Sequence, residues 1–368
     1  MSCRVEIAGR TDRGLVREGN EDAILVANLD LGEVLEVSKL QIVDGVRGPL
    51  LVLCDGMGGS VGGEVASNLA CSAIFKATQA CPATEDRAVL ARNLRRAVRL
   101  ANQAVVAAAK ADKGLEGMGT TVSAAALVSN TVVLAQVGDS RAYVFRGSTL
   151  SQITRDQSVV SALVRSGQLS EERAAYSMQR GRILQAVGSS EDVEVSLSIA
   201  ELRVGDRIVL CSDGLHEFVE HAAMAKACAA ASLQDAAEQL IQLANAQGGM
   251  DNISVLLAEV SGGVLRQPRA GEDEVRFTEL DPNLEGESAL STTSIVGRRL
   301  AHQAGIRKGP GPARLPATAQ HPAIPEEHVL GLGPAERELA AQGRVHVLGW
   351  VAIVGIMLLG LAYALGLL

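Results

Sequence analysis

Aromatic residues are scarce in this sequence. Only 2% of its 368 residues are Phe, Trp or Tyr, whereas 47% are hydrophobic, so a core must be built from Val, Leu, Ile and Ala. Histidine is scarce as well, and residues 1–261 contain only His216 and His221. Because zinc sites depend on His and Cys ligands, a zinc cage or a phosphohistidine mechanism has little to work with.

The sequence also lacks a basic excess and paired cysteines. Its formal net charge is -8, which argues against a nucleic-acid partner because neutralising phosphates requires a basic face. The six cysteines form no CxxC pair, and the first residues do not resemble a secretion signal. Free thiols in a reducing cytosol are the simplest interpretation.

Short β-branched apolar runs and alanine-rich stretches alternate over residues 1–261, which we predict to form one domain. Ser129-Asn130 and Arg146-Gly147 are typical hairpin turns, so many strands should be antiparallel neighbours, and the grouping indicates α+β layers. Strands are predicted over Ala23–Asn28, Leu50–Cys54, Val122–Val128, Thr131–Val137, Arg141–Phe145, Val193–Ile199, Arg207–Cys211 and Ile253–Val260. Helices are predicted over Gly63–Ala80, Asp86–Lys110 and Leu233–Gln247, with Asp86 and Ser232 as caps.

The composition changes over residues 262–344, where eight of the ten prolines fall. Such a stretch cannot bury enough apolar surface to offset its chain entropy, so a disordered linker is predicted. A small packed subdomain is the alternative. The run Ser291-Thr292-Thr293-Ser294 within it could be phosphorylated or could simply aid solubility.

Residues 345–368 contain the longest uncharged run. No charged residue occurs from Val347 to Leu368, about 22 residues, and about 20 suffice to cross the hydrocarbon layer as a helix. Trp350 and Tyr363 lie towards opposite ends of the run, as in aromatic belts. Basic residues precede the run and none follows it. We therefore expect one transmembrane helix in the inner membrane, with the preceding domain in the cytoplasm; a buried core helix is the alternative.

Acidic residues stand at the ends of five predicted strands. One Asp-Gly turn is weak evidence because this is also common turn chemistry, but five such positions favour a shared role. They are Asp55-Gly56 after Leu50–Cys54, Gly138-Asp139 after Thr131–Val137, Asp213-Gly214 after Arg207–Cys211, Asp251 before Ile253–Val260, and Glu21-Asp22 before Ala23–Asn28.

If these carboxylates converge, they cannot all be ionised without a cation. Two unit charges about 4 Å apart repel by roughly 4 kcal/mol at an effective dielectric constant of 20. Oxygen ligands select hard ions, Mg²⁺ or Mn²⁺, over zinc. Two such ions would lower the pKa of a bridging water and hold a phosphoryl group, so the pattern predicts hydrolysis of a phosphate ester.

Six motifs in this order resemble the phosphatase 2C (PPM) family of metal-dependent Ser/Thr phosphatases, especially its bacterial branch. They span residues 11–260 and are specific as an ordered set. The motifs are Thr11–Asp22, Asp55-Gly56-Met57-Gly58-Gly59, Gly117–Thr121, Val137–Tyr143, Cys211–Leu215 and Gly248–Ser254.

The resemblance implies a four-layer α-β-β-α sandwich with a binuclear Mn²⁺ or Mg²⁺ site that directs a metal-bound water in line at phosphoserine or phosphothreonine. In the family pattern, Asp55 would bridge the two ions, the Gly56 carbonyl would hold one of them, and Asp213 and Asp251 would hold the other. Asp22 and Glu21 would act mainly through metal-bound water, and Asp139 would hold a third ion. Arg17 would bind the substrate phosphate. Partners would be phosphorylated proteins, among them a cognate Ser/Thr kinase.

The sequence departs from the family at three places. Met57 replaces the histidine that animal members use as a general acid, although bacterial members share the methionine. Gln157 replaces a frequent histidine, and Ser177-Met178 stands where His-Pro is usual in the flap, about Val159–Gly188. His216 is a candidate replacement acid.

The sequence leaves two other functions open. Cys81 and Arg87 fit the Cys-x₅-Arg spacing of cysteine phosphatases, but Glu85 and Asp86 would repel phosphate and the loop has no glycine. The other rival is a membrane-tethered phosphoprotein binder with the same fold and an inactive site. Loss of a metal-binding aspartate would mark that protein, and none is lost.

Overall fold

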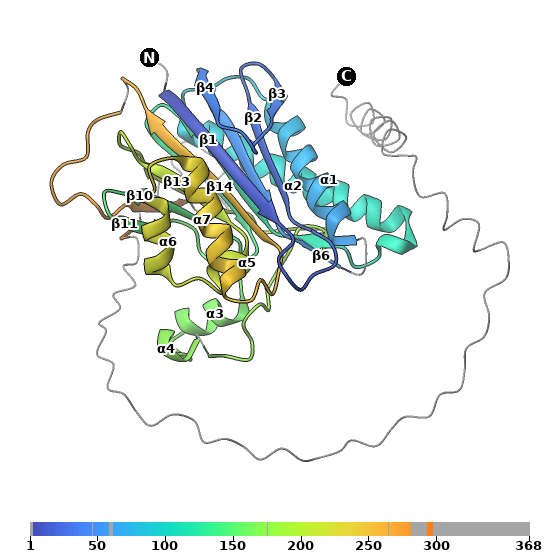
Figure 1. The fold of residues 1–368 in the computed structure, drawn as a ribbon. Helices are drawn as coiled ribbons and strands as arrows, with labels where there is room; N and C mark the ends of the chain where they lie inside the picture. The colour runs from blue at the N-terminus through green and yellow to red at the C-terminus, as the bar shows by residue number, and fades with distance from the viewer. Residues whose placement is uncertain are drawn as a thin grey trace, which may run out of the picture. The chain divides into compact units, whose positions relative to one another are not determined.

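Two antiparallel sheets pack face to face in the computed structural model, which describes residues 3–45, 47–58, 62–174, 176–263, 265–280 and 293–296 (Figure 1). In this part of the chain, one sheet has the order β11-β10-β13-β14-β1-β4. Its strands are β1 (Cys3–Asp12), β4 (Gln41–Gly45), β10 (Arg141–Arg146), β11 (Thr149–Gln152), β13 (Arg207–Cys211) and β14 (Ile253–Ser261).

The other sheet has the order β16-β15-β12-β9-β8-β5-β2-β3 among the described strands. These are β2 (Ala23–Asn28), β3 (Glu33–Leu35), β5 (Pro49–Cys54), β8 (Val122–Val128), β9 (Thr131–Val137), β12 (Ser196–Glu201), β15 (Arg276–Leu280) and β16 (Thr293–Val296). A short ribbon of β6 (Gly56–Met57) and β7 (Gly119–Thr120) extends one end.

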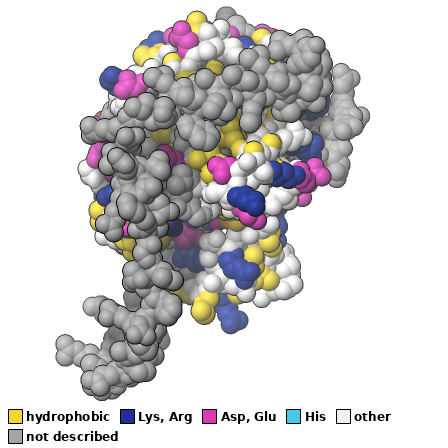
Figure 2. Space-filling model, turned by 90° about the vertical axis from the view of Figure 1, so that its right-hand side faces the viewer, with side chains coloured by type: hydrophobic (Ala, Val, Ile, Leu, Met, Phe, Trp, Pro, Cys, Tyr) yellow, Lys and Arg dark blue, Asp and Glu magenta, His cyan; other side chains and the backbone are white. Residues whose placement is uncertain are grey.

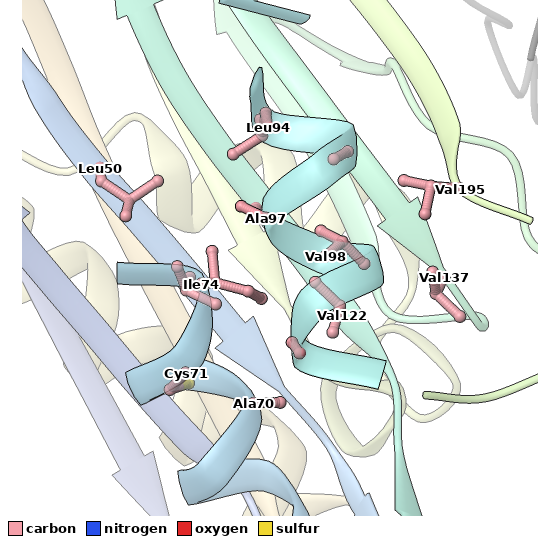
Figure 3. Packing of buried hydrophobic residues seen from close by; sticks show 14 of the residues in the cluster. Leu50, Ala70, Cys71, Ile74, Leu94, Ala97, Val98, Val122, Val137 and Val195 are labelled. Carbon is pink, nitrogen blue, oxygen red and sulfur yellow. The ribbon is translucent and has the colours of Figure 1, made fainter. Parts of the chain in front are cut away.

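Helices cover both outer faces of the sandwich. Ala70 and Ile74 of α1 and Leu94 and Val98 of α2 are buried against the sheet that contains β5 and β8 (Figure 3). The helices α5, α6 and α7 cover the other sheet, and a third apolar cluster fills the space between the sheets. The helices are α1 (Gly62–Gln79), α2 (Arg87–Ala111), α3 (Val159–Arg165), α4 (Glu171–Ala174), α5 (Asp213–His216), α6 (His221–Cys228) and α7 (Leu233–Ala246). The predicted α+β layering is thus confirmed.

Local signals placed most of the elements correctly. The strands at Ala23–Asn28, Val122–Val128, Thr131–Val137 and Arg207–Cys211 have the predicted bounds. Asp86 caps α2 by accepting a hydrogen bond of 2.7 Å from the Ala88 amide. The strand predicted at Val193–Ile199 begins later, at Ser196, and β1 was not predicted.

The predicted linker over residues 262–344 is wrong in its first part. Strand β15 lies within that range and pairs with β12, with Phe277 opposite Ala200. Leu265, Val275 and Phe277 are buried in the core between the sheets, so this proline-poor start belongs to the folded domain. Strand β16 pairs in turn with β15.

The predicted transmembrane helix, residues 345–368, and most of the linker lie outside the described residues. Among the residues that are described, no helix is long and apolar enough to span a bilayer. On the part of the face in Figure 2 that grey atoms do not cover, acidic and basic side chains are interspersed.

Candidate functional site

Two of the predicted site residues lie at the ends of neighbouring strands in one sheet. Asp22 precedes β2 and Asp55 follows β5; because these strands are antiparallel and pair Ala23 with Cys54, the two aspartates lie at the same edge. Thr121, just before β8, fixes Asp55: the Asp55 amide donates to the Thr121 hydroxyl at 3.0 Å, and the Thr121 amide donates to the Asp55 carbonyl at 2.8 Å.

Two further residues come from the other sheet at the same end of the sandwich. Asp213 follows β13 as the first residue of α5, and Asp251 precedes β14, the antiparallel neighbour of β13. Ser212 connects the sheets, since its hydroxyl donates to Asp22 at 2.9 Å and accepts a hydrogen bond from the Ser254 amide at 2.9 Å. The topology therefore gathers side chains that are far apart in sequence.

Burial and mutual repulsion disfavour the ionised forms of these carboxylates. Burial and then the charges of Asp213 and Asp22 raise the pKa of Asp55 well above its usual range. Burial, together with neighbouring carboxylates, raises the pKa of Asp22 and Asp139 to about 7, and burial and Asp251 raise the pKa of Asp213 to about 6. These are the consequences expected of acidic groups gathered without a counter-ion.

The donor set fits hard divalent cations. Asp22 is buried, and its Oδ1 atom has no hydrogen-bond partner. All of the gathered side chains offer oxygen, which Mg²⁺ and Mn²⁺ prefer. Within the described ranges, no three His, Cys, Asp or Glu side chains already form a metal cage.

Gly56 follows Asp55 where two backbone segments leave no room for a side chain. A Cβ atom added there would lie 2.3 Å from the Gly63 carbonyl oxygen and 2.5 Å from the Glu21 carbonyl oxygen. Glu21 itself is half-buried, and burial raises the pKa of its side chain. The structure therefore places both predicted residues at the edge of the acidic cluster.

The loop between β1 and β2 places Arg17 against the acidic cluster. Its Nη2 atom lies 2.7 Å from Asp251 Oδ2, and Arg17 remains about half exposed. The amides of Leu15 and Val16 donate to the Gly249 carbonyl at 2.8 and 3.2 Å, which ties the Arg17 loop to the Asp251 loop. A guanidinium predicted to bind phosphate thus lies beside a predicted metal ligand.

Asn252 organises the site although it was not singled out from the sequence. Its side-chain oxygen accepts a hydrogen bond from the Glu21 amide at 2.8 Å, and its side-chain nitrogen donates to the Arg13 and Gly19 carbonyls at 2.9 Å each. It thereby holds the Arg17 loop over the cluster. The only local signal was a polar residue next to Asp251 at the start of an apolar strand.

The flap segment, residues 159–188, contains α3 and α4 and borders a cavity of about 610 Å³. Asp139 and His216 line this cavity. His216 Nε2 lies 3.0 Å from the Asp139 carbonyl oxygen, and burial lowers the His216 pKa to about 3. His216 is therefore neutral at physiological pH and unsuited to donate a proton. The side-chain oxygen of Gln157 accepts a hydrogen bond of 2.8 Å from the Gly138 amide.

The raised pKa of Asp139 predicts a pH dependence of stability in metal-free buffer. Its folded pKa of about 7 exceeds the unfolded value of about 3.9, so the folded state binds the proton more tightly. The stabilising effect is complete below about pH 4 and is lost as the pH rises through 7. Relative to Asp139→Asn, the wild-type free energy of unfolding should fall by about 1.4 kcal/mol per pH unit across this window. Urea titrations of both proteins in EDTA at several pH values measure this difference in the free energy of unfolding. A difference that does not change with pH would contradict the raised pKa of Asp139.

Comparison with known proteins identifies relatives of this chain. Residues 39–257 match the family model described as protein phosphatase 2C. The chain is 36% identical over 251 residues to the serine/threonine phosphatase stp of Listeria monocytogenes, covering 68% of this chain and 94% of the relative.

A second relative is the serine/threonine protein phosphatase PstP of Mycobacterium tuberculosis, 38% identical over 304 residues. The match covers 81% of this chain but 54% of PstP, so the chain spans about half the length of that relative. The crystal structure of the PstP catalytic domain, in complex with two manganese ions, is 36% identical and superposes with a TM-score of 0.59 over 71% of this chain and all of that one.

Proposed function

Because this chain belongs to the protein phosphatase 2C family, we propose that it is a metal-dependent protein phosphatase acting on phosphoserine and phosphothreonine. The observation that carries the proposal is the convergence of Asp22, Asp55, Asp139, Asp213 and Asp251 from strand ends of both sheets. Release of inorganic phosphate from a phosphothreonine peptide by the purified protein with Mn²⁺ tests it; no release would refute it.

Each acidic residue has a proposed place in the site. Asp55 would bridge two Mn²⁺ or Mg²⁺ ions, the Gly56 carbonyl would hold one, and Asp213 and Asp251 would hold the other. Asp22 and Glu21 would act through water, and Asp139 would hold a third ion. When bound, the ions supply an activated water and neutralise the phosphate charge. The catalytic domain of PstP, with its two manganese ions, supports this assignment.

The contribution of the protein groups is to orient these ligands and the phosphate. Thr121 fixes the backbone of Asp55, and Ser212 fixes the side chain of Asp22. Arg17 is exposed enough to reach a substrate, and its planar guanidinium suits two phosphate oxygens. We propose that Arg17 binds the substrate phosphate while it remains beside Asp251.

Arg17→Ala should therefore weaken substrate binding more than metal binding. Charge-assisted contacts of this kind contribute about 1.5–3 kcal/mol, so KM should rise by about 10- to 100-fold. Steady-state kinetics on a phosphothreonine peptide and Mn²⁺ titration calorimetry measure the two effects. Collapse of metal affinity with an unchanged KM would show that Arg17 has a different role.

The rival cysteine mechanism finds no support in the surroundings of Cys81. This residue follows the C-terminal end of α1, where its thiol donates to the Ala77 carbonyl at 3.3 Å. The other end of the helix lies near the acidic cluster, since a Cβ atom on Gly63 would lie 2.6 Å from Glu21 Cδ. The thiol therefore lies away from the proposed phosphate site.

We also propose that residues 345–368 tether the enzyme to the inner membrane, with the phosphatase domain in the cytoplasm. The support is the uncharged run from Val347 to Leu368. Phosphorylated membrane proteins, a Ser/Thr kinase among them, would then be its substrates. Full-length protein should sediment with membranes and resist carbonate extraction. Recovery of the full-length protein in the soluble fraction would contradict the tether.

A further inference from the structure

Three large apolar side chains are exposed beside the acidic cluster. Leu15 is 68% exposed, Val16 57% and Met250 51%. Single exposed apolar residues are ordinary on protein surfaces. These three differ because Val16 directly precedes Arg17 and Met250 directly precedes Asp251, the pair joined at 2.7 Å. The loops that carry the exposed apolar side chains therefore also carry Arg17 and Asp251 of the proposed phosphate site.

The backbone beneath these side chains is closely fitted. The Leu15 and Val16 amides both donate to the Gly249 carbonyl. Gly249 has a φ of 51°, and a Cβ atom there would lie 2.8 Å from Leu15 Cγ, so Leu15 packs directly over this glycine. A Cβ atom on Gly248 would lie 3.6 Å from Met250 Cγ. Leu15 and Met250 thus lie over adjacent glycines of one loop.

A second set of contacts keeps the two loops together. A Cβ atom on Gly14 would lie 2.2 Å from the Asp251 carbonyl oxygen, so the loops approach as closely as glycine allows. The side-chain nitrogen of Asn252 donates to the Arg13 and Gly19 carbonyls on either side of Arg17. The backbone that carries the apolar side chains is therefore held in place before substrate arrives, which reduces the entropy lost on binding.

We infer that Leu15, Val16 and Met250 form an apolar docking surface for side chains that flank the phosphorylated residue of a substrate. The inference rests on the proposed function. Consecutive Cα atoms in a peptide are about 3.8 Å apart, so the side chains that flank a phosphorylated residue stay close to it. Leu15 lies over Gly249 in the loop that carries Asp251, the residue that Arg17 contacts at 2.7 Å. A phosphate held at Arg17 therefore brings flanking side chains to this surface. The expected substrates carry apolar rather than polar or charged residues there.

Two phosphothreonine peptides test the inference. They are identical except that both residues flanking phosphothreonine are Leu in one and Ser in the other. Partial burial of a leucine side chain should give the full-length protein a kcat/KM about five- to tenfold higher for the Leu peptide. Equal values for the two peptides would overturn the inference. Failure to cleave either peptide would instead refute the proposed phosphatase function.

Substitutions in the docking surface provide a second test of the inference. The double substitution Leu15→Ser with Met250→Ser should bring the Leu/Ser ratio of kcat/KM to within about twofold of unity. Leu31→Ser is the matched control, because Leu31 is 67% exposed and lies beyond the opposite end of β2 from Asp22. An unchanged ratio in the double variant, or an equal fall in the control, would overturn the inference. So would a change in molecular mass of the double variant in solution, since that would assign the surface to self-association.

Discussion

Asp55→Asn is expected to lower kcat/KM on a phosphothreonine peptide by on the order of 10³-fold or more. Removing a single electrostatic group from a catalytic site already costs about 10²- to 10³-fold, and Asp55 is the proposed bridge between two ions. Its carboxyl group lies at the centre of the cluster, where Asp213, Asp22 and Asp139 all raise its pKa. Steady-state kinetics with saturating Mn²⁺ measure the loss.

Measurements of stability distinguish this loss of activity from misfolding of the variant. At neutral pH the raised pKa means that the Asp55 carboxylate opposes folding in the absence of metal, so Asp55→Asn should be at least as stable as wild type in EDTA. Mn²⁺ should raise the melting temperature of the wild type more than that of the variant, which keeps Asp139, Asp213 and Asp251 but lacks the bridging carboxylate. Cys81→Ser is the control and should retain full activity. Equal losses in the two variants would revive a cysteine mechanism.

The acidic cluster could be predicted because each residue stands directly beside a strand with a clear local signal. Leu50–Cys54 and Ile208–Cys211 are apolar throughout, and an aspartate follows each of them within two residues. Antiparallel pairing then brings chain ends together at one edge of a sheet, as with Asp22 and Asp55. The resemblance to the phosphatase 2C family predicted which of these strand ends lie together.

The supporting contacts could not be predicted because their partners are far apart in sequence. Arg17 and Asp251 are separated by 234 positions, and Ser212 and Asp22 by 190. Nothing local distinguishes Asn252 from any other polar residue at a strand end. Only the folded topology shows that it joins the Arg17 loop to the Glu21 backbone.

Strand β15 was missed because composition was averaged over a long stretch. Eight of the ten prolines fall in residues 262–344, and the composition of this whole stretch concealed the short run Arg276–Leu280. Its Phe277 is buried between the sheets, which offsets the cost of ordering the segment. A truncation at residue 262 would remove this strand from the sheet, so the full-length protein is the appropriate material for enzymology.

Removal of divalent metal should abolish activity completely. Asp22 and Asp139 have pKa values of about 7 and Asp213 about 6 without a counter-ion, so at pH 8 the site holds several repelling carboxylates. Every proposed ligand is an oxygen. His216, the described histidine next to Asp139, is a weak base because burial lowers its pKa to about 3, and its Nε2 atom lies 3.0 Å from the Asp139 carbonyl oxygen. We therefore expect the bound metal ions to supply the activated water.

The most direct test is phosphate release from a phosphothreonine peptide by full-length protein that has been exhaustively chelated and then titrated with Mn²⁺. We predict no turnover after chelation, recovery of activity as Mn²⁺ is added, and no recovery with Zn²⁺ at the same concentrations. Full turnover after chelation, with metal content verified by elemental analysis, would contradict the two-metal assignment.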